Sequence, residues 1–340
     1  MTISLKTHKI LWARSGGKCA ICKNDLVIDP TDLNDDPSIV GEEAHIIARS
    51  ESFTRGDYDS PSPEERDHYL NLILLCKTHH KQVDDQPAEY TVEKLREIKA
   101  RHEAAVKEHC TDEDEKKQKD ELIYAGYIDE WGTKAHLDNW RAVCSWLSSD
   151  SPTFPKAWYD DQRELLIWII GRIWPGRYPL LESALHNYKA VLQDLLKVFD
   201  QHIDHDRKDE RYIHTKKFYK IPEWDPELYA RLAKQYDEHV NLVNDLFFEL
   251  TRAANYICDR VRETIFDGYR LKEGALLIER HSVGFELKTV TAKVEYRGRE
   301  RTEMPYPGLT GFKKVRYQTR DYALDPNPPE LPISNEDEDA

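Results

Sequence analysis

The chain has 340 residues and a mass of 39.9 kDa, which is enough for two domains. Its formal net charge of −14 excludes a protein that holds nucleic acid by bulk positive charge alone. The most apolar run, residues 165–170, is far shorter than the roughly 20 residues of a membrane helix, and the chain opens with no basic-then-apolar leader. We therefore expect a soluble, cytoplasmic protein that does not contact the membrane.

The first hundred residues predict a small α+β domain. Helical spacing over residues 5–14 stops at a pair of glycines, 16–17, which suits a left-handed turn. Residues 40–47 and 71–75 are rich in β-formers and predict two antiparallel strands. A long polar loop would join these strands, and a helix should begin near Thr78.

The middle of the chain predicts helices. Residues 111–121 are almost all polar and indicate a charged linker or an exposed helical extension. Residues 122–267 predict a mainly α-helical bundle, because apolar side chains recur at helical spacing over 179–199 and at heptad spacing over 225–265. The second of these helices would be roughly 60 Å long. A bundle core and an interface with a second copy or a partner protein both explain its apolar stripe.

The C-terminal part predicts strands and then a tail. Residues 268–324 contain twelve Lys and Arg against seven Asp and Glu, a local charge of +5, and their alternation predicts a small β-containing segment. Residues 325–340 contain four prolines and end in EDEDA, which predicts a disordered acidic tail.

Four residues near the N-terminus have the spacing of a structural zinc site. Cys19 and Cys22 form C-x-x-C, and Cys76 and His79 form C-x-x-H after 53 intervening residues. His79 and His80 are neighbours, so on a helix they point about 100° apart and cannot both serve one site. We assign His79 to zinc because its spacing is the commoner one, and His80 to a second site. The reverse assignment stays open.

Together these residues resemble the HNH nucleases, which have a zinc-bound ββα-metal finger. The resemblance covers roughly residues 5–105 and is carried by the quartet together with His45 in EEAHII, Asn71 in NLILLC and His80 in CKTHH. It implies an α+β nuclease domain, placed at residues 1–110. It further implies that His45 is the general base, that Asn71 holds a loop and orients the base, and that His80 binds a catalytic Mg²⁺ or Mn²⁺.

General chemistry agrees with these three roles. An imidazole with its ordinary pKa of about 6.5 can accept a proton at neutral pH. A divalent ion supplies positive charge beside a leaving phosphodiester oxygen, and a carboxamide can fix a loop without adding charge. Asp84 and Asp85 could orient His80 from behind, although such a pair often only ends a helix.

Ala44 departs from the family pattern. Many members carry Asp or His at this place, just before the first motif histidine, as a second metal ligand. Glu43 shares a strand face with His45 and is our candidate replacement, with Glu42 as the second choice. Alternatively both glutamates are solvated charges, and His80, water and phosphate hold the ion.

Contacts with substrate are harder to assign. Arg49, Arg55, Lys77 and Lys81 are candidates to meet phosphates, although such cations are more often surface charges without a role. Residues 1–110 contain fifteen Lys and Arg against twenty Asp and Glu, a charge of −5. A strong grip on nucleic acid would therefore need the C-terminal region or a partner.

The expected function is a metal-dependent HNH endonuclease that hydrolyses phosphodiester bonds, in DNA rather than RNA. The helical region would regulate it as a sensor, oligomerisation or docking unit. By analogy of domain architecture, the protein would be an effector of bacterial anti-phage defence. The rival function is a non-catalytic zinc module for nucleic-acid binding or complex assembly, for which Ala44 is the best argument. A third interpretation makes the basic strands at 275–320 an oligonucleotide or nucleotide sensor.

Overall fold

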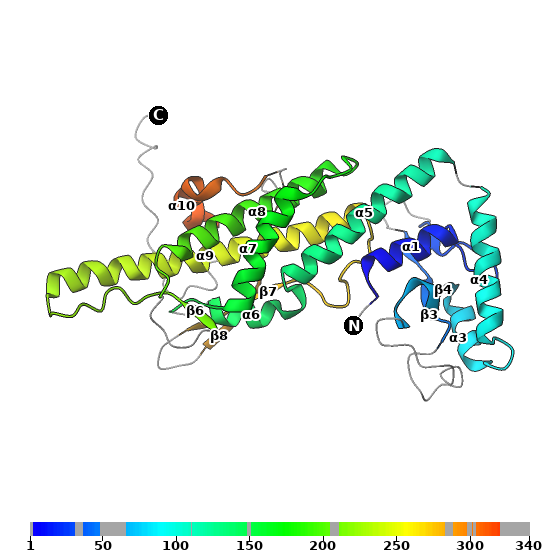
Figure 1. Cartoon of the computed structure of the whole chain (residues 1–340), viewed down its shortest axis with the longest axis horizontal. Coiled ribbons are helices and arrows are strands. Elements are labelled where there is room, and N and C mark those ends of the chain that lie inside the picture. The colour runs from blue at the N-terminus through cyan, green and yellow to red at the C-terminus, as the bar shows by residue number, and fades with distance from the viewer. Residues whose placement is uncertain are drawn as a thin grey trace. The chain divides into compact units, whose positions relative to one another are not determined.

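A computed structural model describes residues 3–30, 37–47, 66–109, 111–147, 151–204, 211–282, 288–297, 301 and 304–319. The chain divides into two compact units, Met1–Asp129 and Glu130–Ala340, called here the N-terminal and the C-terminal unit (Figure 1). None of the described helices is both long enough and apolar enough to cross a membrane.

The N-terminal unit combines helices with two small antiparallel sheets, one more than the sequence predicts. Strand β1 pairs with β2, and β3 pairs with β4. The elements in chain order are α1 (Leu5–Ser15), β1 (Val27–Ile28), β2 (Ser38–Ile39), β3 (Gly41–His45), the 3-10 helix η1 (Tyr69–Asn71), β4 (Leu72–Cys76), α3 (Lys77–Asp85), α4 (Val92–Lys107) and most of α5 (Asp112–Lys134).

Helix α1 ends at the predicted glycine pair. Gly16 and Gly17 have φ angles of 59° and 66°, in the left-handed region where a residue without Cβ is not strained. Their N–H groups donate to the carbonyls of Ala13 and Trp12 and so satisfy the last turn of the helix. The chain is thereby turned directly into the loop that carries the first two cysteines.

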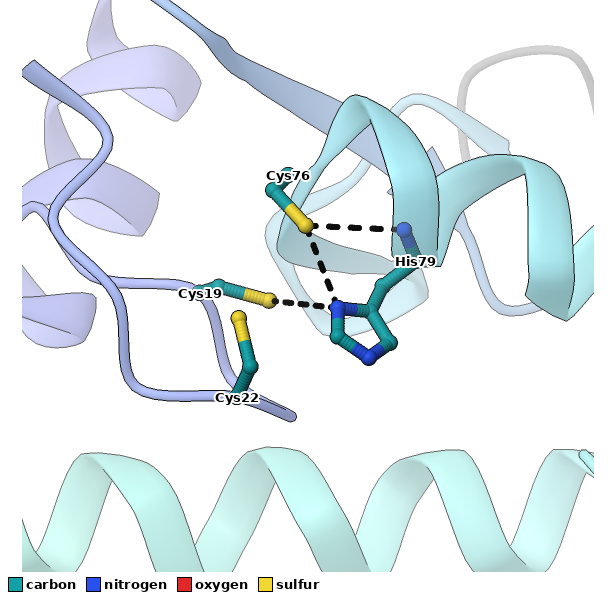
Figure 2. Close-up of side chains that lie close together, drawn as sticks. All are labelled: Cys19, Cys22, Cys76 and His79. Atoms are coloured by element: carbon teal, nitrogen blue, oxygen red, sulfur yellow. Dashed lines mark hydrogen bonds between the residues drawn. The ribbon is translucent and has the colours of Figure 1, made fainter.

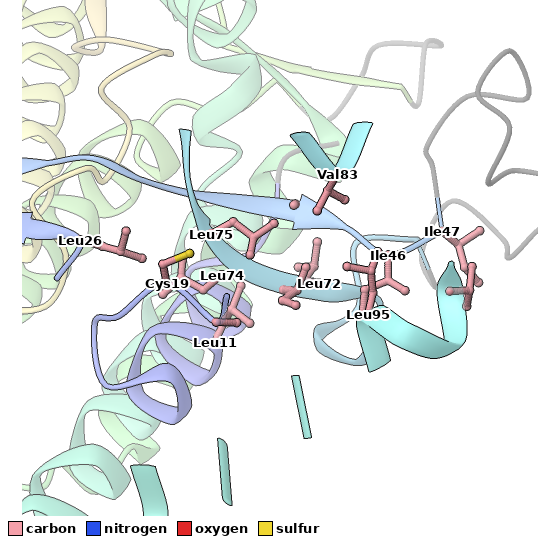
Figure 3. Close-up of a cluster of buried hydrophobic side chains, with 14 residues drawn as sticks. Leu11, Cys19, Leu26, Ile46, Ile47, Leu72, Leu74, Leu75, Val83 and Leu95 are labelled. Carbon is pink, nitrogen blue, oxygen red and sulfur yellow. The ribbon is translucent and has the colours of Figure 1, made fainter. Parts of the chain in front are cut away.

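Strands β3 and β4 form the centre of the unit. Their antiparallel register pairs Gly41 with Cys76 and His45 with Leu72. Residues 72–75 of β4 are all buried, because helices and the cysteine loop cover both faces of this two-stranded sheet. The core around the sheet is shown in Figure 3 and contains Ala44 as well.

Helix α5 closes the N-terminal unit. The Asp129 carboxylate accepts hydrogen bonds of 2.9 Å from the backbone N–H groups of both Leu5 and Lys6, at the start of α1. Lys9 forms a 3.0 Å ion pair with Glu121. Apart from Thr111, the charged segment at 111–121 forms the first turns of this helix, and the helix continues to Lys134.

The C-terminal unit is mainly helical, and α8 packs along α9 (Figure 1). Two further two-stranded sheets pair β5 with β6 and β7 with β8, both antiparallel. The elements are η2 (Leu137–Asn139), α6 (Trp140–Leu147), β5 (Thr153–Pro155), α7 (Lys156–Gly171), α8 (Pro179–Asp200), β6 (Tyr212–His214), α9 (Pro226–Thr264), β7 (Leu277–Ser282), β8 (Lys288–Lys293) and α10 (Gly308–Thr319).

Helix α9 is 39 residues long and covers the range over which heptad spacing was found. Asp225 caps its N-terminus by accepting from the N–H groups of Glu227 and Leu228. Its apolar stripe is buried within the unit itself, but so is every residue from Leu242 to Cys258, on all sides of the helix. Helix α9 is therefore a central helix over these turns and not a one-sided amphipathic one.

Helix α10 lies in a segment for which the sequence predicted strands only. It follows Pro307 and buries Phe312 and Arg316, which are four residues apart on one face. Arg316 forms an ion pair with the buried Asp245 of α9, with 3.3 Å between Nη1 and Oδ2. Because the charged Arg316 occupies a buried position of α10, the apolar residues of this helix do not recur at helical spacing in the sequence. The acidic tail predicted at 325–340 lies outside the described residues.

Candidate active site

Four side chains converge on one point in the N-terminal unit (Figure 2). Cys19 and Cys22 lie in the turn after α1, Cys76 ends β4, and His79 lies in the first turn of α3. Their ligand atoms all lie within 4.8 Å of one another. His79 Nδ1 lies 3.1 Å from Cys76 Sγ and 3.7 Å from Cys19 Sγ. The structure thus places His79, and not His80, in this quartet.

The quartet has the geometry and the donor chemistry of a zinc site. A tetrahedral zinc with bonds of about 2.0–2.3 Å separates its ligand atoms by about 3.5–3.8 Å. Burial raises the pKa of Cys19, but hydrogen bonds from backbone groups of Cys22, Cys76 and Ile21 outweigh it and lower the pKa below its ordinary value. A lowered pKa favours the thiolate, which is the form that binds zinc. Among the described residues, the quartet is the only group of three or more His, Cys, Asp or Glu side chains with metal-binding spacing.

Backbone hydrogen bonds hold the cysteine loop in place. The N–H of Ala20 donates to the carbonyl of Leu74 over 2.9 Å, which fastens the loop to the central strand β4. Within the loop, the N–H of Cys19 donates to the carbonyl of Asn24 over 2.9 Å. The two halves of the quartet are therefore positioned by the same strand.

His45 lies at the end of β3 and is paired with a carboxylate. Its Nε2 lies 3.0 Å from Oδ1 of Asp67, in the segment just before η1. The two side chains are 20% and 13% exposed, so the contact is shielded but open to solvent on one side. When Nε2 donates its proton to Asp67, Nδ1 is left as the proton acceptor of the ring.

Asn71 clamps the backbone beside His45. Its Oδ1 accepts from the N–H of Ile47 over 2.8 Å, and its Nδ2 donates to the carbonyls of Ile47 and Arg66 over 3.2 and 3.0 Å. The side chain is only 8% exposed. Asn71 thus joins the two ends of the segment 48–65, which itself lies outside the described residues.

The 3-10 helix that carries Asn71 is fastened to α4. The Tyr69 hydroxyl donates to the Glu103 carboxylate, and Arg14 Nη1 donates to the same hydroxyl over 3.1 Å. Lys99 Nζ lies 2.6 Å from Glu103 and 3.8 Å from the centre of the Tyr69 ring. Burial and the hydrogen bond to Glu103 raise the pKa of Tyr69, so the phenol stays a neutral donor. These contacts hold the segment between Asp67 and Asn71 in a single position.

His80 is the fourth residue of α3 and lies between two carboxylates. Its Nδ1 lies 2.7 Å from Glu42 Oε2, and its Nε2 lies 3.5 Å from Asp84 Oδ2. The three side chains are 28%, 41% and 41% exposed, so solvent and a phosphate can reach them. An imidazole beside a carboxylate is a donor type that fits Mn²⁺ or Mg²⁺. The two carboxylates face different ring nitrogens, however, and these three side chains do not have the metal-binding spacing of the quartet. A metal at either ring nitrogen would replace a proton shared with a carboxylate.

Glu43 does not meet His80 but turns to α1. Its Oε1 lies 2.5 Å from His8 Nδ1 and accepts a 2.9 Å hydrogen bond from Trp12 Nε1. Burial alone would raise the pKa of Glu43. The hydrogen bond and the positive charge of His8, together with the hydrogen bond from Trp12, outweigh burial and lower the pKa below its ordinary value. A buried carboxylate is stabilised by such donors, which explains why Glu42, the second choice from the sequence, is the glutamate beside His80.

Two of the four cations predicted to contact nucleic acid belong to the described residues. Lys77 and Lys81 are exposed in the first turns of α3. Lys81 Nζ lies 2.8 Å from Asp85, which raises the pKa of that lysine and uses part of its charge locally. Arg49 and Arg55 lie outside the described residues.

The sequence reasoning overlooked Asp67, His8 and Trp12. Asp67 lies four residues before Asn71, but no spacing in the sequence showed that it would meet His45. His8 and Trp12 are four residues apart and so share one face of the predicted helix. What that face meets is decided by tertiary packing, and no local signal pointed to Glu43.

Comparison with known families supports the geometry. The model of the HNH endonuclease family matches residues 19–86, a range that includes the quartet as well as His45, Asn71 and His80. No family was recognised in the C-terminal region, and no curated protein matches the chain. Residues 19–86 of the N-terminal unit are therefore similar to the HNH endonuclease family.

Proposed function

We propose that the chain is a metal-dependent endonuclease that hydrolyses phosphodiester bonds, with DNA preferred to RNA. The HNH domain implies nuclease activity in general. The observation that carries the proposal is the His45–Asp67 pair beside the Asn71 clamp. A purely structural zinc module needs the quartet but has no use for a histidine held in this way.

His45 would act as the general base. Its Nδ1 takes a proton from the attacking water while Nε2 remains bonded to Asp67. The carboxylate keeps the ring in one tautomer and stabilises the positive charge that the ring gains. Asn71 keeps the backbone after His45 from moving, so the ring stays aimed at the same point.

His80 and Glu42 would hold the divalent ion, Mg²⁺ or Mn²⁺, and Asp84 would orient the ring from its other nitrogen. When bound, such an ion supplies positive charge beside the scissile phosphate and its leaving oxygen. Ala44 is fully buried in the core and offers no ligand, so water and phosphate oxygens would complete the coordination. We therefore expect weak binding of the ion in the absence of substrate.

Substrate phosphates would be met by Lys77 and Lys81, and by Arg49 and Arg55, which lie outside the described residues. Lys77 and Lys81 are exposed at the same end of α3 as His80. The negative charge of this part of the chain makes that grip weak, so further contacts with nucleic acid are needed elsewhere.

We extend the proposal to regulation by the C-terminal unit, as a sensor, oligomerisation or docking element. Helix α5 supports this role because it runs from one unit into the other and caps α1 through Asp129. A nuclease held in check by a large helical unit suits an effector of bacterial anti-phage defence, and the zinc site would hold the nuclease fold together.

The test is plasmid nicking by the purified full chain with Mg²⁺ or Mn²⁺, beside a His45→Ala variant of matched zinc content. We expect cleavage that needs the ion and is lost in the variant. RNA of the same sequence, tested in parallel, decides the preference for DNA. Equal cleavage by both proteins would show that His45 is not the base.

If the full chain shows no cleavage, a second experiment uses the N-terminal part alone. The fragment should end at Lys134 and not near residue 110, because Glu121 and Asp129 contact α1. If this fragment binds zinc, shows the helix content of the folded unit and still cuts neither DNA nor RNA, the non-catalytic zinc module becomes the better description.

A further inference from the structure

Five aromatic side chains form a continuous row in the C-terminal unit, called here the aromatic ladder. They come from the segment before α9 and from the first turns of α9 itself. The ring centres of successive members are 5.2, 6.0, 4.8 and 5.6 Å apart. The members, in spatial order, are Trp224, Tyr229, Tyr219, Tyr236 and Phe218.

The ladder leads from solvent to the core. Trp224 is 74% exposed, whereas Tyr236 is only 5% exposed and belongs to the buried stripe of α9. An indole that stays in water forgoes the favourable free energy of burying its apolar surface. A largely exposed tryptophan therefore indicates a surface that could bind a ligand. Because the inner rings are packed on α9, the outer ring is presented with little freedom to lose on binding.

Cations surround the same segment. Residues 211–222 include Arg211, Lys216, Lys217 and Lys220 and no acidic residue, in a chain of net charge −14. Within the part of the chain that the structure describes, none of the three lysines forms a salt bridge. Glu223 follows this run directly, and Asp225 accepts the N–H groups that cap α9.

The backbone of this segment is already ordered. The N–H of Lys216 donates to the carbonyl of His202 over 2.7 Å, which ties the segment to the end of α8. The N–H of Lys220 donates to the carbonyl of Lys217 over 3.0 Å and closes a tight turn. Phe218 and Tyr219 lie in this turn, so the three lysines and the ladder are held together before any ligand arrives.

We propose that the aromatic ladder with Lys216, Lys217 and Lys220 is a binding surface for single-stranded nucleic acid. Exposed rings stack on unpaired bases, and lysines beside them neutralise the phosphates. In a duplex the faces of the bases are already stacked on one another and cannot stack on Trp224. The duplex would therefore be bound only through its phosphates, and more weakly than the single strand. That the bound strand is a substrate or product of the nuclease rests on the proposed function, whereas the binding itself does not.

The experiment measures binding and not cleavage. Full-length protein carrying His45→Ala, without added Mg²⁺ or Mn²⁺, is titrated against a fluorescent single-stranded DNA of about 20 nucleotides and against the duplex of the same sequence, by anisotropy. We expect the single strand to bind more tightly. Trp224→Ala should weaken that binding roughly five- to hundredfold, and Trp224→Phe, which keeps a ring, should restore most of it.

The lysines are tested by their salt dependence. Changing all three to Gln should lower the slope of log affinity against log salt concentration by about two units. The matched control changes Lys116, Lys117 and Lys119 of α5 to Gln, which removes the same charge from another exposed site. This control should leave the slope within about half a unit of the parent.

Three results would overturn the proposal. They are no binding of the single strand, equal binding by the Trp224→Ala variant, and a duplex affinity that matches the single strand and depends on Trp224 to the same extent. Each leaves the nicking experiment unaffected. A chain that cuts DNA but fails here retains its proposed function and loses only this surface.

Discussion

His45 Nε2 and Asp67 Oδ1 lie 3.0 Å apart, although the two residues are 22 positions apart in the chain. They are brought together because β3 ends at His45, while Asp67 precedes the 3-10 helix that Tyr69 fastens to α4. The carboxylate therefore has a defined position against the ring before substrate binds. This relationship makes Asp67 a positioning residue for the proposed base.

Replacing Asp67 by Asn should lower kcat at least about tenfold while KM changes little. The amide would donate to Nε2 and force the ring proton onto Nδ1, the nitrogen that has to accept a proton from water. Steady-state kinetics on a defined oligonucleotide measure the split between kcat and KM. Zinc content and far-UV circular dichroism should match the parent. A rise in KM alone, with kcat intact, would mean that Asp67 contacts substrate instead.

Glu42 and Glu43 should behave differently although they are neighbours. Glu42→Gln removes a carboxylate beside His80 and should raise the Mg²⁺ concentration for half-maximal cleavage several-fold. Glu43→Gln keeps one acceptor oxygen but removes the negative charge that His8 and Trp12 stabilise, so it should loosen α1 by about 1–3 kcal/mol. Metal titration of activity and hydrogen exchange of the α1 amides separate the two effects. An unchanged metal dependence in Glu42→Gln, with a changed one in Glu43→Gln, would return the ligand role to Glu43.

Removal of zinc should unfold the N-terminal unit and leave the C-terminal unit folded. Cys76→Ser takes one ligand from the quartet and leaves a hydroxyl that can still cap α3. We expect about one zinc per parent chain by metal analysis, and almost none in the variant, because structural zinc stabilises its fold directly. Cys110→Ser, outside the quartet, is the matched control. Full zinc content in Cys76→Ser would rule out the quartet as the site.

Acid should weaken the C-terminal unit through His239. Burial, followed by the nearby charge of His202, lowers the pKa of His239 to about 4. Between about pH 6.5 and 4 the unfolded chain binds a proton that the folded unit excludes, so this contribution is complete above pH 6.5 and falls with decreasing pH, by at most about 3 kcal/mol.

His239→Phe should flatten this pH dependence because a phenyl ring fills the same place without titrating. Urea unfolding at pH 7.5 and pH 5, followed by tryptophan fluorescence, is the measurement. The signal reports on the right unit, since seven of the eight tryptophans lie beyond residue 130. Parallel pH profiles for the parent and the variant would show that His239 titrates normally in the folded unit.

Local patterns were sufficient for the parts of the site that are close in sequence. The two C-x-x pairs predicted the quartet, because a metal site needs its ligands at fixed short spacing. The glycine pair after α1 and the β-rich runs at β3 and β4 likewise predicted elements that the structure contains. These signals depend on backbone preference and on periodicity, which neighbouring residues carry by themselves.

Only the tertiary structure decided which side chains face one another. Strand alternation put Glu43 on the face of His45, but the donors that hold Glu43 come from α1, and Glu42 is the one that reaches His80. The heptad spacing of α9 likewise did not indicate that Glu249 is buried. Its carboxylate accepts a 2.6 Å hydrogen bond from the Tyr296 hydroxyl. A buried charge is stabilised by its partner, and when that partner lies many residues away its position depends on the whole fold.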